Sequence, residues 1–266
     1  MSKSIEFIVG SRNDTHFGNP MERLHTSLSH NLKILDDKDN WRFTIVDWGS
    51  DVPIKDKLKI KHRNLRYIYV PKDVCETVPT SFSEVHCQNV GAFRSDKDYV
   101  SRIDQDTMMG HKFVKWFFDD HSYVDNTFYF NRRFDLYAGI DFINGPGKPS
   151  SPVDWPAFLC DTGIFLVPRE AWHSATGYDE KNIFRNHMEH EFIFRLNQKL
   201  NFEDLTKQVG YDFFHVYHIK TVSGYKYNRQ LSPGELKSLP FVANDIDDWG
   251  LQKFNDSIEI TEFKDE

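Results

Sequence analysis

The sequence is poor in cysteine, and the cysteines that it has form no recognisable framework. Cys75, Cys87 and Cys160 are odd in number, and no two of them are spaced as C-x-x-C. This arrangement argues against a disulfide scaffold and against a zinc knuckle. We therefore expect the reduced thiols of a cytoplasmic protein.

The chain also lacks a long apolar run and an excess of positive charge. No apolar stretch approaches the roughly 20 residues of a membrane-spanning helix, and the opening MSKSIEFIVG has no signal-peptide profile. A formal charge of −7 argues against a general nucleic-acid binder, which needs a basic face. We expect neither a transmembrane segment nor a nucleic-acid partner.

What the sequence does contain is an alternation of strands and helices over its first 120 residues. Short apolar runs at residues 5–9, 42–47, 65–70 and 97–103 predict strands. Apolar positions three or four apart after Pro20 predict a helix, and residues 80–95 predict another, with Thr80 or Ser81 as N-cap and Glu84 in a capping box. The alternation predicts an α/β domain with a mostly parallel sheet.

Beyond residue 122 the pattern changes to a mixture of strands, loops and helices. A late strand ends in FFHVYHI, and the segment 245–266 is acidic and expected to be loosely held. We expect a single domain, because the chain length suits one core.

Three of the four early strands end in polar clusters, GSRND, DWGSD and DQD. Ligands of open α/β sheets bind beyond the carboxyl ends of the strands. The clusters are alternatively ordinary loop formers, since Asp, Asn, Ser and Gly favour turns. If they share one edge, they line a crevice with Arg12, Asp14, Asp47, Asp51, Asp104 and Asp106.

The ordered set of motifs resembles the GT-A class of nucleotide-sugar glycosyltransferases, closest to its family-2-like group. The motifs are FIVGSRND, IVDWGSD, QNVGAFRS with its N-x-G, and YVSRIDQD with its D-x-D. A later run, GIFLVPREAW followed by GYDE and HMEHEF, resembles the acceptor-side segment of that group. The resemblance implies a GT-A (Rossmann-like) fold, with residues 1–122 binding the nucleotide sugar and residues 123–244 forming a smaller, mixed acceptor-side region.

The resemblance also implies a set of site residues around a divalent cation, Mn²⁺ or Mg²⁺. Hard cations prefer carboxylate oxygen, and such an ion neutralises a leaving diphosphate. By resemblance Asp106 is the firmer metal ligand, and Asp104 bridges ribose and metal. The further donor contacts are expected at Arg12, Asp14, Asp47, Asn89, Arg94, Asp161 and Glu191.

Two histidines compete for the remaining metal position. His215 and His218 both lie near the end of the late strand, and we favour His218 because it stands at the outer end. The sequence does not choose between them.

The catalytic base is expected to be Glu189. Inverting transfer needs a carboxylate to accept the proton of the attacking hydroxyl. The acidic pair of the group is Glu-Asp, whereas the aligned residues here are Met188 and Glu189, so the chain departs from the pattern at this point.

These features predict a metal-dependent, inverting glycosyltransferase that moves a sugar from a nucleoside-diphosphate sugar, expected to be UDP-linked, to a glycan hydroxyl. One alternative is an inactive carbohydrate- or nucleotide-sugar-binding module, and another is a sugar-nucleotide pyrophosphorylase. A zinc hydrolase is disfavoured, because His190-Glu191 is not followed by the second histidine of H-E-x-x-H.

Overall fold

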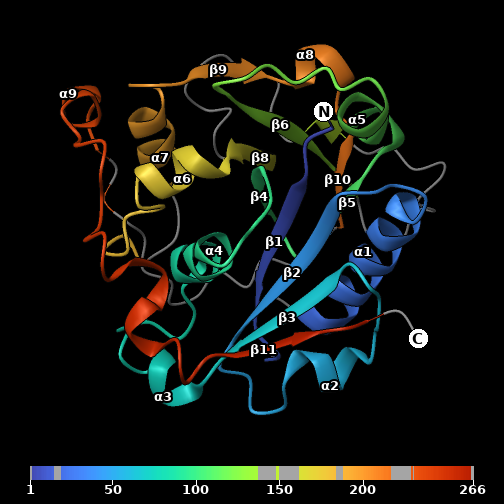
Figure 1. Cartoon of the computed structure of the whole chain (residues 1–266), viewed down its shortest axis with the longest axis vertical. Helices are drawn as coiled ribbons and strands as arrows, with labels where there is room; N and C mark the ends of the chain where they lie inside the picture. The colour runs from blue at the N-terminus through green and yellow to red at the C-terminus, as the bar shows by residue number, and fades with distance from the viewer. Residues whose placement is uncertain are drawn as a thin grey trace.

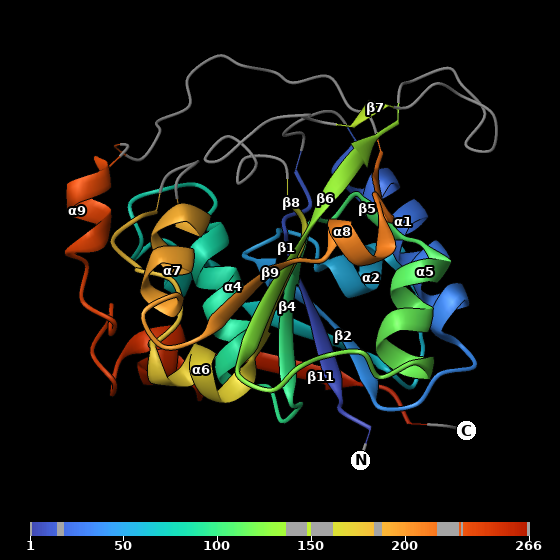
Figure 2. The same ribbon diagram turned by 90° about the horizontal axis from the view of Figure 1, so that it is seen from above.

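A central twisted sheet with helices on both faces forms the molecule (Figure 1). The computed structural model describes residues 2–14, 19–136, 148–149, 162–183, 188–216, 229 and 231–264. Helices α1, α2 and α5 lie on one side of the sheet, and α4, α6 and α7 lie on the other (Figure 2).

The order of elements confirms the alternation expected for the first half of the chain. The strands are β1 (Ile5–Ser11), β2 (Trp41–Trp48), β3 (Leu65–Val70), β4 (Tyr99–Ile103), β5 (Thr107–Met109), β6 (Thr127–Asp135), β7 (Lys148–Pro149), β8 (Thr162–Pro168), β9 (Asn201–Asp204), β10 (Phe213–His215) and β11 (Glu259–Glu262). The helices are α1 (Pro20–Leu35), α2 (Ile54–Leu58), α3 (Lys72–Cys75), α4 (Glu84–Phe93), α5 (His111–Val114) with its π-helical continuation η1 (Lys115–Asp119), α6 (Arg169–Ser174), α7 (Met188–Leu196), α8 (Thr206–Val209), α9 (Pro233–Lys237) and the 3₁₀ segment η3 (Trp249–Phe254).

The sheet has a parallel part and a mixed part. Its order is β11-β3-β2-β1-β4-β8-β6-β10-β5, with β7 and β9 also paired to β6. The neighbours β3, β2, β1 and β4 are parallel. On the far side of β4, strand β8 runs antiparallel to both β4 and β6. The predicted mostly parallel sheet with a smaller mixed region is confirmed.

Strand β1 is buried on both faces, which explains its unbroken apolar run. Ile5, Phe7 and Val9 pack into the core on the side of α1, whereas Ile8 packs into the core on the side of α4. Helix α4 approaches β1 closely, because a Cβ atom on Gly91 would lie 2.7 Å from Cγ2 of Ile8. The glycine of the N-x-G motif therefore serves packing of the helix on the sheet.

The predicted start of α4 is wrong. The helix begins at Glu84 with Ser83 as N-cap, and no side-chain capping bond forms. The Glu84 carboxylate instead binds Arg102 of β4, at 2.7 Å from Nη2. A charged partner across the fold thus takes the place of the capping box.

The expectation of a loosely held tail is wrong for the described residues up to 264. Strand β11 pairs antiparallel with β3 at the edge of the sheet. Before it, Trp249 is only 2% exposed, and its ring packs edge-on against Phe93 of α4. Apolar residues scattered among the acids anchor this segment. The overall acidic composition does not reveal them.

Within the described ranges, no helix has the length and apolar character needed to cross a membrane.

Candidate active site

The carboxyl ends of β2, β1 and β4 lie side by side, because these strands are parallel neighbours in the sheet. The polar segments that follow them, residues 12–14, 49–51 and 104–106, therefore meet at one edge. Two of these segments bond directly, since Ser50 Oγ accepts the N–H of Asn13 at 2.8 Å. The edge predicted from the sequence exists.

Asp106 of the D-x-D motif is buried between an arginine and a histidine. It is 4% exposed, its Oδ2 pairs with the guanidinium of Arg23 in α1, and its Oδ1 lies 3.4 Å from Nε2 of His215. Nδ1 of the same histidine lies 3.1 Å from Oδ1 of Asp135 at the end of β6. Burial lowers the pKa of His215, but the hydrogen bonds to Asp106 and Asp135 outweigh that effect and raise the pKa above its ordinary value. The structure thus brings His215 to the D-x-D motif.

Helix α1 also holds the backbone of the D-x-D loop through two further buried polar side chains. Ser27 Oγ donates to the carbonyl oxygen of Gln105 at 2.5 Å. Asn31 donates from Nδ2 to the carbonyl oxygen of Thr107 at 2.9 Å and accepts the N–H of Met109 at 2.8 Å. The apolar positions of the helix, from which the helix was predicted, do not indicate this role. The signal was the four-residue spacing of these polar side chains, which begins at the arginine that binds Asp106.

Asp104 lies between two arginines. Its Oδ1 is 2.6 Å from Nη2 of Arg102, and its Oδ2 is 3.5 Å from Nη1 of Arg133 in β6. Arg133 also contacts Asp135, with Nε 3.1 Å from Oδ1. Neither arginine was predicted. The position of Arg102 inside the buried strand, two residues before the motif, was the only local signal.

Glu189 stands at the start of α7 and faces the same arginine. It is 9% exposed, and its Oε1 lies 3.4 Å from Nη2 of Arg102. Burial raises the pKa of Glu189 to about 7, although the charge of Arg102 lowers it. Desolvation therefore outweighs the ion pair. A carboxyl with this pKa changes its protonation near neutral pH, which suits a general base.

The donor types at this edge fit a hard divalent cation. Mn²⁺ and Mg²⁺ prefer carboxylate oxygen, and imidazole suits several of the transition metals. The contacts join five carboxylates to three guanidiniums and one imidazole, so acidic groups outnumber basic ones. Among the described residues, no group of three or more His, Cys, Asp or Glu is already arranged to hold a metal ion. The residue types therefore fit a divalent cation. To bind one, at least one of the D-x-D carboxylates would have to release the arginine that now contacts it.

The predicted donor contacts of the first loop lie at the edge. Arg12 donates to the carbonyl oxygen of Ser81, and its Nε lies 3.7 Å from Oδ2 of Asp14. Both side chains are about a quarter exposed, at 27% and 26%. They are therefore accessible to a ligand.

Asp47 holds its own loop. It is 2% exposed, and it accepts the N–H of Ser50 at 3.2 Å and the N–H of Ile54 at 2.8 Å. Burial raises the pKa of Asp47, and these hydrogen bonds oppose the rise. In this structure the carboxylate is bonded to the start of α2. The contact of Asp47 with the base or ribose stays a prediction.

Asn89 and Arg94 are bonded to other parts of the chain, although the sequence assigned both to the donor. Asn89 is fully buried, donates to Tyr178 and Glu180, and accepts the N–H of Tyr178 at 2.9 Å. It therefore secures the GYDE turn. Arg94 follows the carboxyl end of α4, at the opposite end of the sheet, where it donates to the carbonyl oxygen of Gly250 at 2.8 Å. Donor binding by these two residues stays a prediction.

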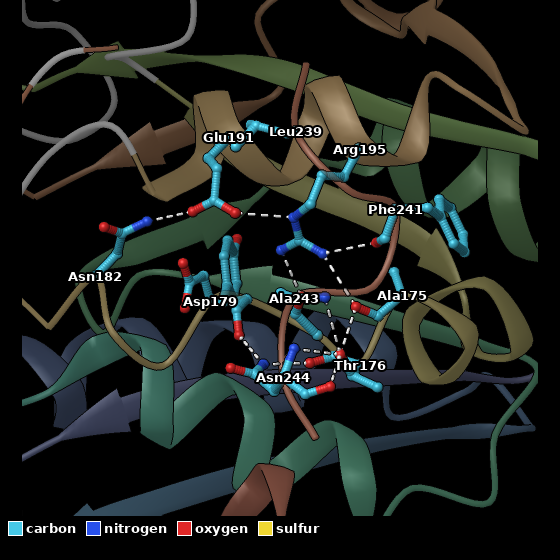
Figure 3. A network of polar contacts seen from close by, with 12 residues as sticks. Ala175, Thr176, Asp179, Asn182, Glu191, Arg195, Leu239, Phe241, Ala243 and Asn244 are labelled. Carbon is cyan, nitrogen blue, oxygen red and sulfur yellow. Dashed lines mark hydrogen bonds and ion pairs between the residues drawn. The ribbon is translucent and has the colours of Figure 1, made fainter. Parts of the chain in front are cut away.

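Glu191 belongs to a buried network between α7 and the C-terminal segment (Figure 3). Its Oε1 lies 2.8 Å from Nε of Arg195, and its Oε2 accepts from Asn182. Arg195 is 1% exposed and also donates to the carbonyl oxygens of Ala175, Gly177 and Phe241. The network joins α7 to the 175–182 turn and to the C-terminal segment. Donor binding by Glu191 stays a prediction.

Two predicted site residues, Asp161 and His218, lie outside the described residues.

No known protein-family model matches the chain, and no curated protein is significantly similar to it in sequence.

The fold is the GT-A type of the glycosyltransferases, with a mostly parallel central sheet flanked by helices. Two solved structures illustrate the likeness. One is Staphylococcus aureus TarS, residues 1–349, in complex with UDP, with a TM-score of 0.53 and 13% identity over 80% of this chain. This chain spans 60% of that TarS chain.

The other is a mutant of Drosophila β-1,4-galactosyltransferase 7 in complex with manganese, UDP-Gal and xylobiose. Its TM-score is 0.52 at 15% identity, and the match covers 92% of this chain and 83% of that one. At such identities the likeness establishes the fold alone.

Proposed function

We propose that this protein is a glycosyltransferase that moves a sugar from a nucleoside-diphosphate sugar to a carbohydrate hydroxyl with inversion. The observation that carries the proposal is the meeting of Glu189 with Asp104 of the D-x-D motif on one guanidinium, that of Arg102. This meeting lies at the carboxyl end of the parallel strands, where open α/β sheets bind ligands. A UDP-linked donor and a sugar acceptor are supported by TarS, solved with UDP, and by the galactosyltransferase, solved with UDP-Gal and xylobiose.

In the proposed reaction Glu189 acts as general base. It takes the proton of the acceptor hydroxyl as that oxygen forms its bond to the anomeric carbon. On the opposite face, the bond between the anomeric carbon and the diphosphate oxygen breaks, and its electron pair leaves with the diphosphate. Because the pKa of Glu189 is raised to about 7, the base is fully ionised only above neutral pH.

Asp104, Asp106 and His215 would hold Mn²⁺ or Mg²⁺, with His218 as the alternative imidazole. When bound, such an ion supplies Lewis-acid neutralisation of the leaving diphosphate. The three side chains suit this role because His215 contacts Asp106 and both aspartates belong to one short loop.

A panel of UDP-, GDP- and CDP-sugars, scored for slow donor hydrolysis and then for transfer, tests the proposal. One UDP-sugar should be consumed, and Glu189→Gln should lower transfer by roughly a hundredfold while UDP affinity stays near normal, since the amide keeps shape but not basicity. Glu191→Gln is measured in parallel as the other acid of the motif, and its folding is checked because its carboxylate binds Arg195. If Glu191→Gln alone abolishes transfer, the base is misassigned. A product that retains the donor's anomeric configuration contradicts inversion.

A binding module without catalysis is the second candidate. It is favoured by one observation, that arginines occupy both D-x-D carboxylates. Stabilisation by UDP that does not depend on Mn²⁺, together with no donor hydrolysis across the panel, would support the module over the enzyme.

A further inference from the structure

One buried arginine joins three separate elements of the candidate site. Arg102 is in β4, and its side chain is 8% exposed. Its Nη2 lies 2.7 Å from Glu84 at the start of α4, 2.6 Å from Asp104 of the D-x-D loop, and 3.4 Å from Glu189 at the start of α7. A second bond, from Nε to Glu84 at 2.9 Å, fixes the plane of the guanidinium.

These contacts give Glu189 a defined orientation. The side chain of a glutamate has three rotatable bonds, so a buried carboxylate takes one position only where a partner selects it. Arg102 is that partner, and the bonds to Glu84 hold it in place.

The same contacts set the charge around Glu189. The groups that face it, among the described residues, are Arg102 from β4, Glu84 from α4, Asp104 from the D-x-D loop and Tyr178 from the preceding turn. Arg102 is the positive group among these four. The two carboxylates oppose ionisation of Glu189, and the buried phenol of Tyr178 is neutral because burial raises its pKa well above the ordinary value.

We propose that Arg102 is the positioning residue of the reaction, which aims the Glu189 carboxylate and keeps it ionised, with Glu84 opposing its effect on charge. The inference rests on the proposed function. It goes further in assigning opposite effects to two residues that touch each other. Arg102 lowers the pKa of Glu189 and Glu84 raises it, although burial is the larger influence.

The experiment compares the wild type with Arg102→Gln and Glu84→Gln over a range of pH. In Arg102→Gln the acid limb of kcat/KM for the acceptor should move up by about one pH unit or more, because an opposite charge within about 4 Å is lost. In Glu84→Gln, which keeps an oxygen acceptor for Arg102, the limb should move down by about half a unit to one unit. A merely structural role lowers the rate equally at every pH.

A second measurement follows Glu189 without catalysis. The difference in unfolding free energy between the wild type and Glu189→Gln is measured against pH, and its inflection marks the titration of Glu189. The same difference in the Arg102→Gln background should have its inflection about one pH unit higher. This result separates the two proposals, because it holds even if no sugar is transferred.

Arg66→Gln is the matched control. It removes a buried arginine from Glu6 at the opposite end of the sheet, where Arg66 is 4% exposed. It should lower thermal stability and leave the acid limb unmoved.

Shifts of the limb in the same direction for Arg102→Gln and Glu84→Gln, or no shift in either, overturn the inference while leaving transfer by Glu189 standing. If Arg102→Gln does not fold, Arg102→Lys and Glu84→Gln carry the test, and an unchanged limb in Glu84→Gln overturns the proposal.

Discussion

The buried position of Glu189 makes its charged form energetically unfavourable. The carboxyl is 9% exposed and shares its only described cationic partner with two other acids. Such a site disfavours the charged form of Glu189, which is the form that the proposed transfer requires. A conflict of this kind between stability and activity is common at catalytic positions.

The raised pKa of Glu189 predicts a pH-dependent stability. Its folded-state pKa, about 7, exceeds the ordinary carboxyl value, so between the two values the native state binds the extra proton. The free energy of unfolding should therefore fall as pH rises from about 4.5 to about 7. Glu189→Gln removes this loss, and it should be more stable than the wild type by on the order of 2 kcal/mol at about pH 8, with a smaller gain at about pH 5.

Urea unfolding of both proteins at the two pH values measures this difference. If the stability difference between the two proteins is the same at both pH values, Glu189 titrates as an ordinary exposed carboxyl.

Asp106 is predicted to matter for both metal use and folding. EDTA should abolish donor turnover and Mn²⁺ should restore it, and Asp106→Asn should lower turnover by on the order of a hundredfold. The same variant leaves the buried guanidinium of Arg23 without its counter-charge, so it should also lose about 3 kcal/mol of stability. Asp96→Asn is the control, since Asp96 belongs to another D-x-D by spacing and its side chain is 72% exposed.

The identity of the imidazole ligand is tested by a pair of variants. Because His215 contacts Asp106, we expect His215→Ala to raise the Mn²⁺ concentration needed for half-maximal donor turnover by about tenfold or more. His218→Ala is measured in parallel. A larger effect in His218→Ala would mean that His218, the histidine favoured by the sequence, is the metal ligand.

At the scale of elements, helix α1 acts as the support of the D-x-D loop. Its apolar side joins the core, and its buried polar side bonds the loop backbone from Gln105 to Met109. A loop held at several points is pre-organised, which limits the entropy lost when a ligand binds.

Removing one of these bonds should loosen the loop. Asn31→Ala leaves the carbonyl of Thr107 and the N–H of Met109 without their side-chain partner, at a cost of about 2–3 kcal/mol. Donor turnover should fall by roughly tenfold or more, because the carboxylates lose their placement. Ser29→Ala, on the exposed side of the same helix, should change stability by no more than about 0.5 kcal/mol. Full activity in Asn31→Ala would show that the helix is not needed to place the loop.

At the scale of the whole molecule, the C-terminal segment connects the two sides of the structure. Near α7 it meets the network of Figure 3, where Asn244 bonds to Thr176. It then packs through Trp249 against α4 and α6, and it ends as β11 on the edge of the sheet. The turn at residues 175–182 and the parallel part of the sheet are thus held by one chain segment.

Trp249→Ala tests the contribution of this segment. The indole is 2% exposed and packs against Phe93 and His173, so truncation should cost about 3–5 kcal/mol. Ile246→Ala, at 60% exposure in the same segment, should change stability by no more than about 0.5 kcal/mol. Thermal unfolding of both variants measures the contrast. Similar melting temperatures for the two would mean that the segment adds little.

The strands and helices of the first half followed from local pattern. Hydrophobic periodicity reports which face of an element is buried, and neither β1 nor α1 depends on distant residues for that signal. Hydrophobic periodicity did not predict that the acidic tail is anchored. The residues that anchor it are single apolar side chains separated by acids.

The site divides in the same way. The sequence by itself determined that Asp104, Asp106 and Glu189 are present, and the order of strands implied that polar segments meet at one edge. Only the tertiary structure decided which charge each of them faces, because the partners are remote in sequence: Arg23 is separated from Asp106 by 83 positions. The same holds for Asn89 and Glu191, whose side chains the fold commits to the GYDE turn and to Arg195. Residue type and spacing are local properties, whereas burial and ion pairing arise only when distant elements pack together.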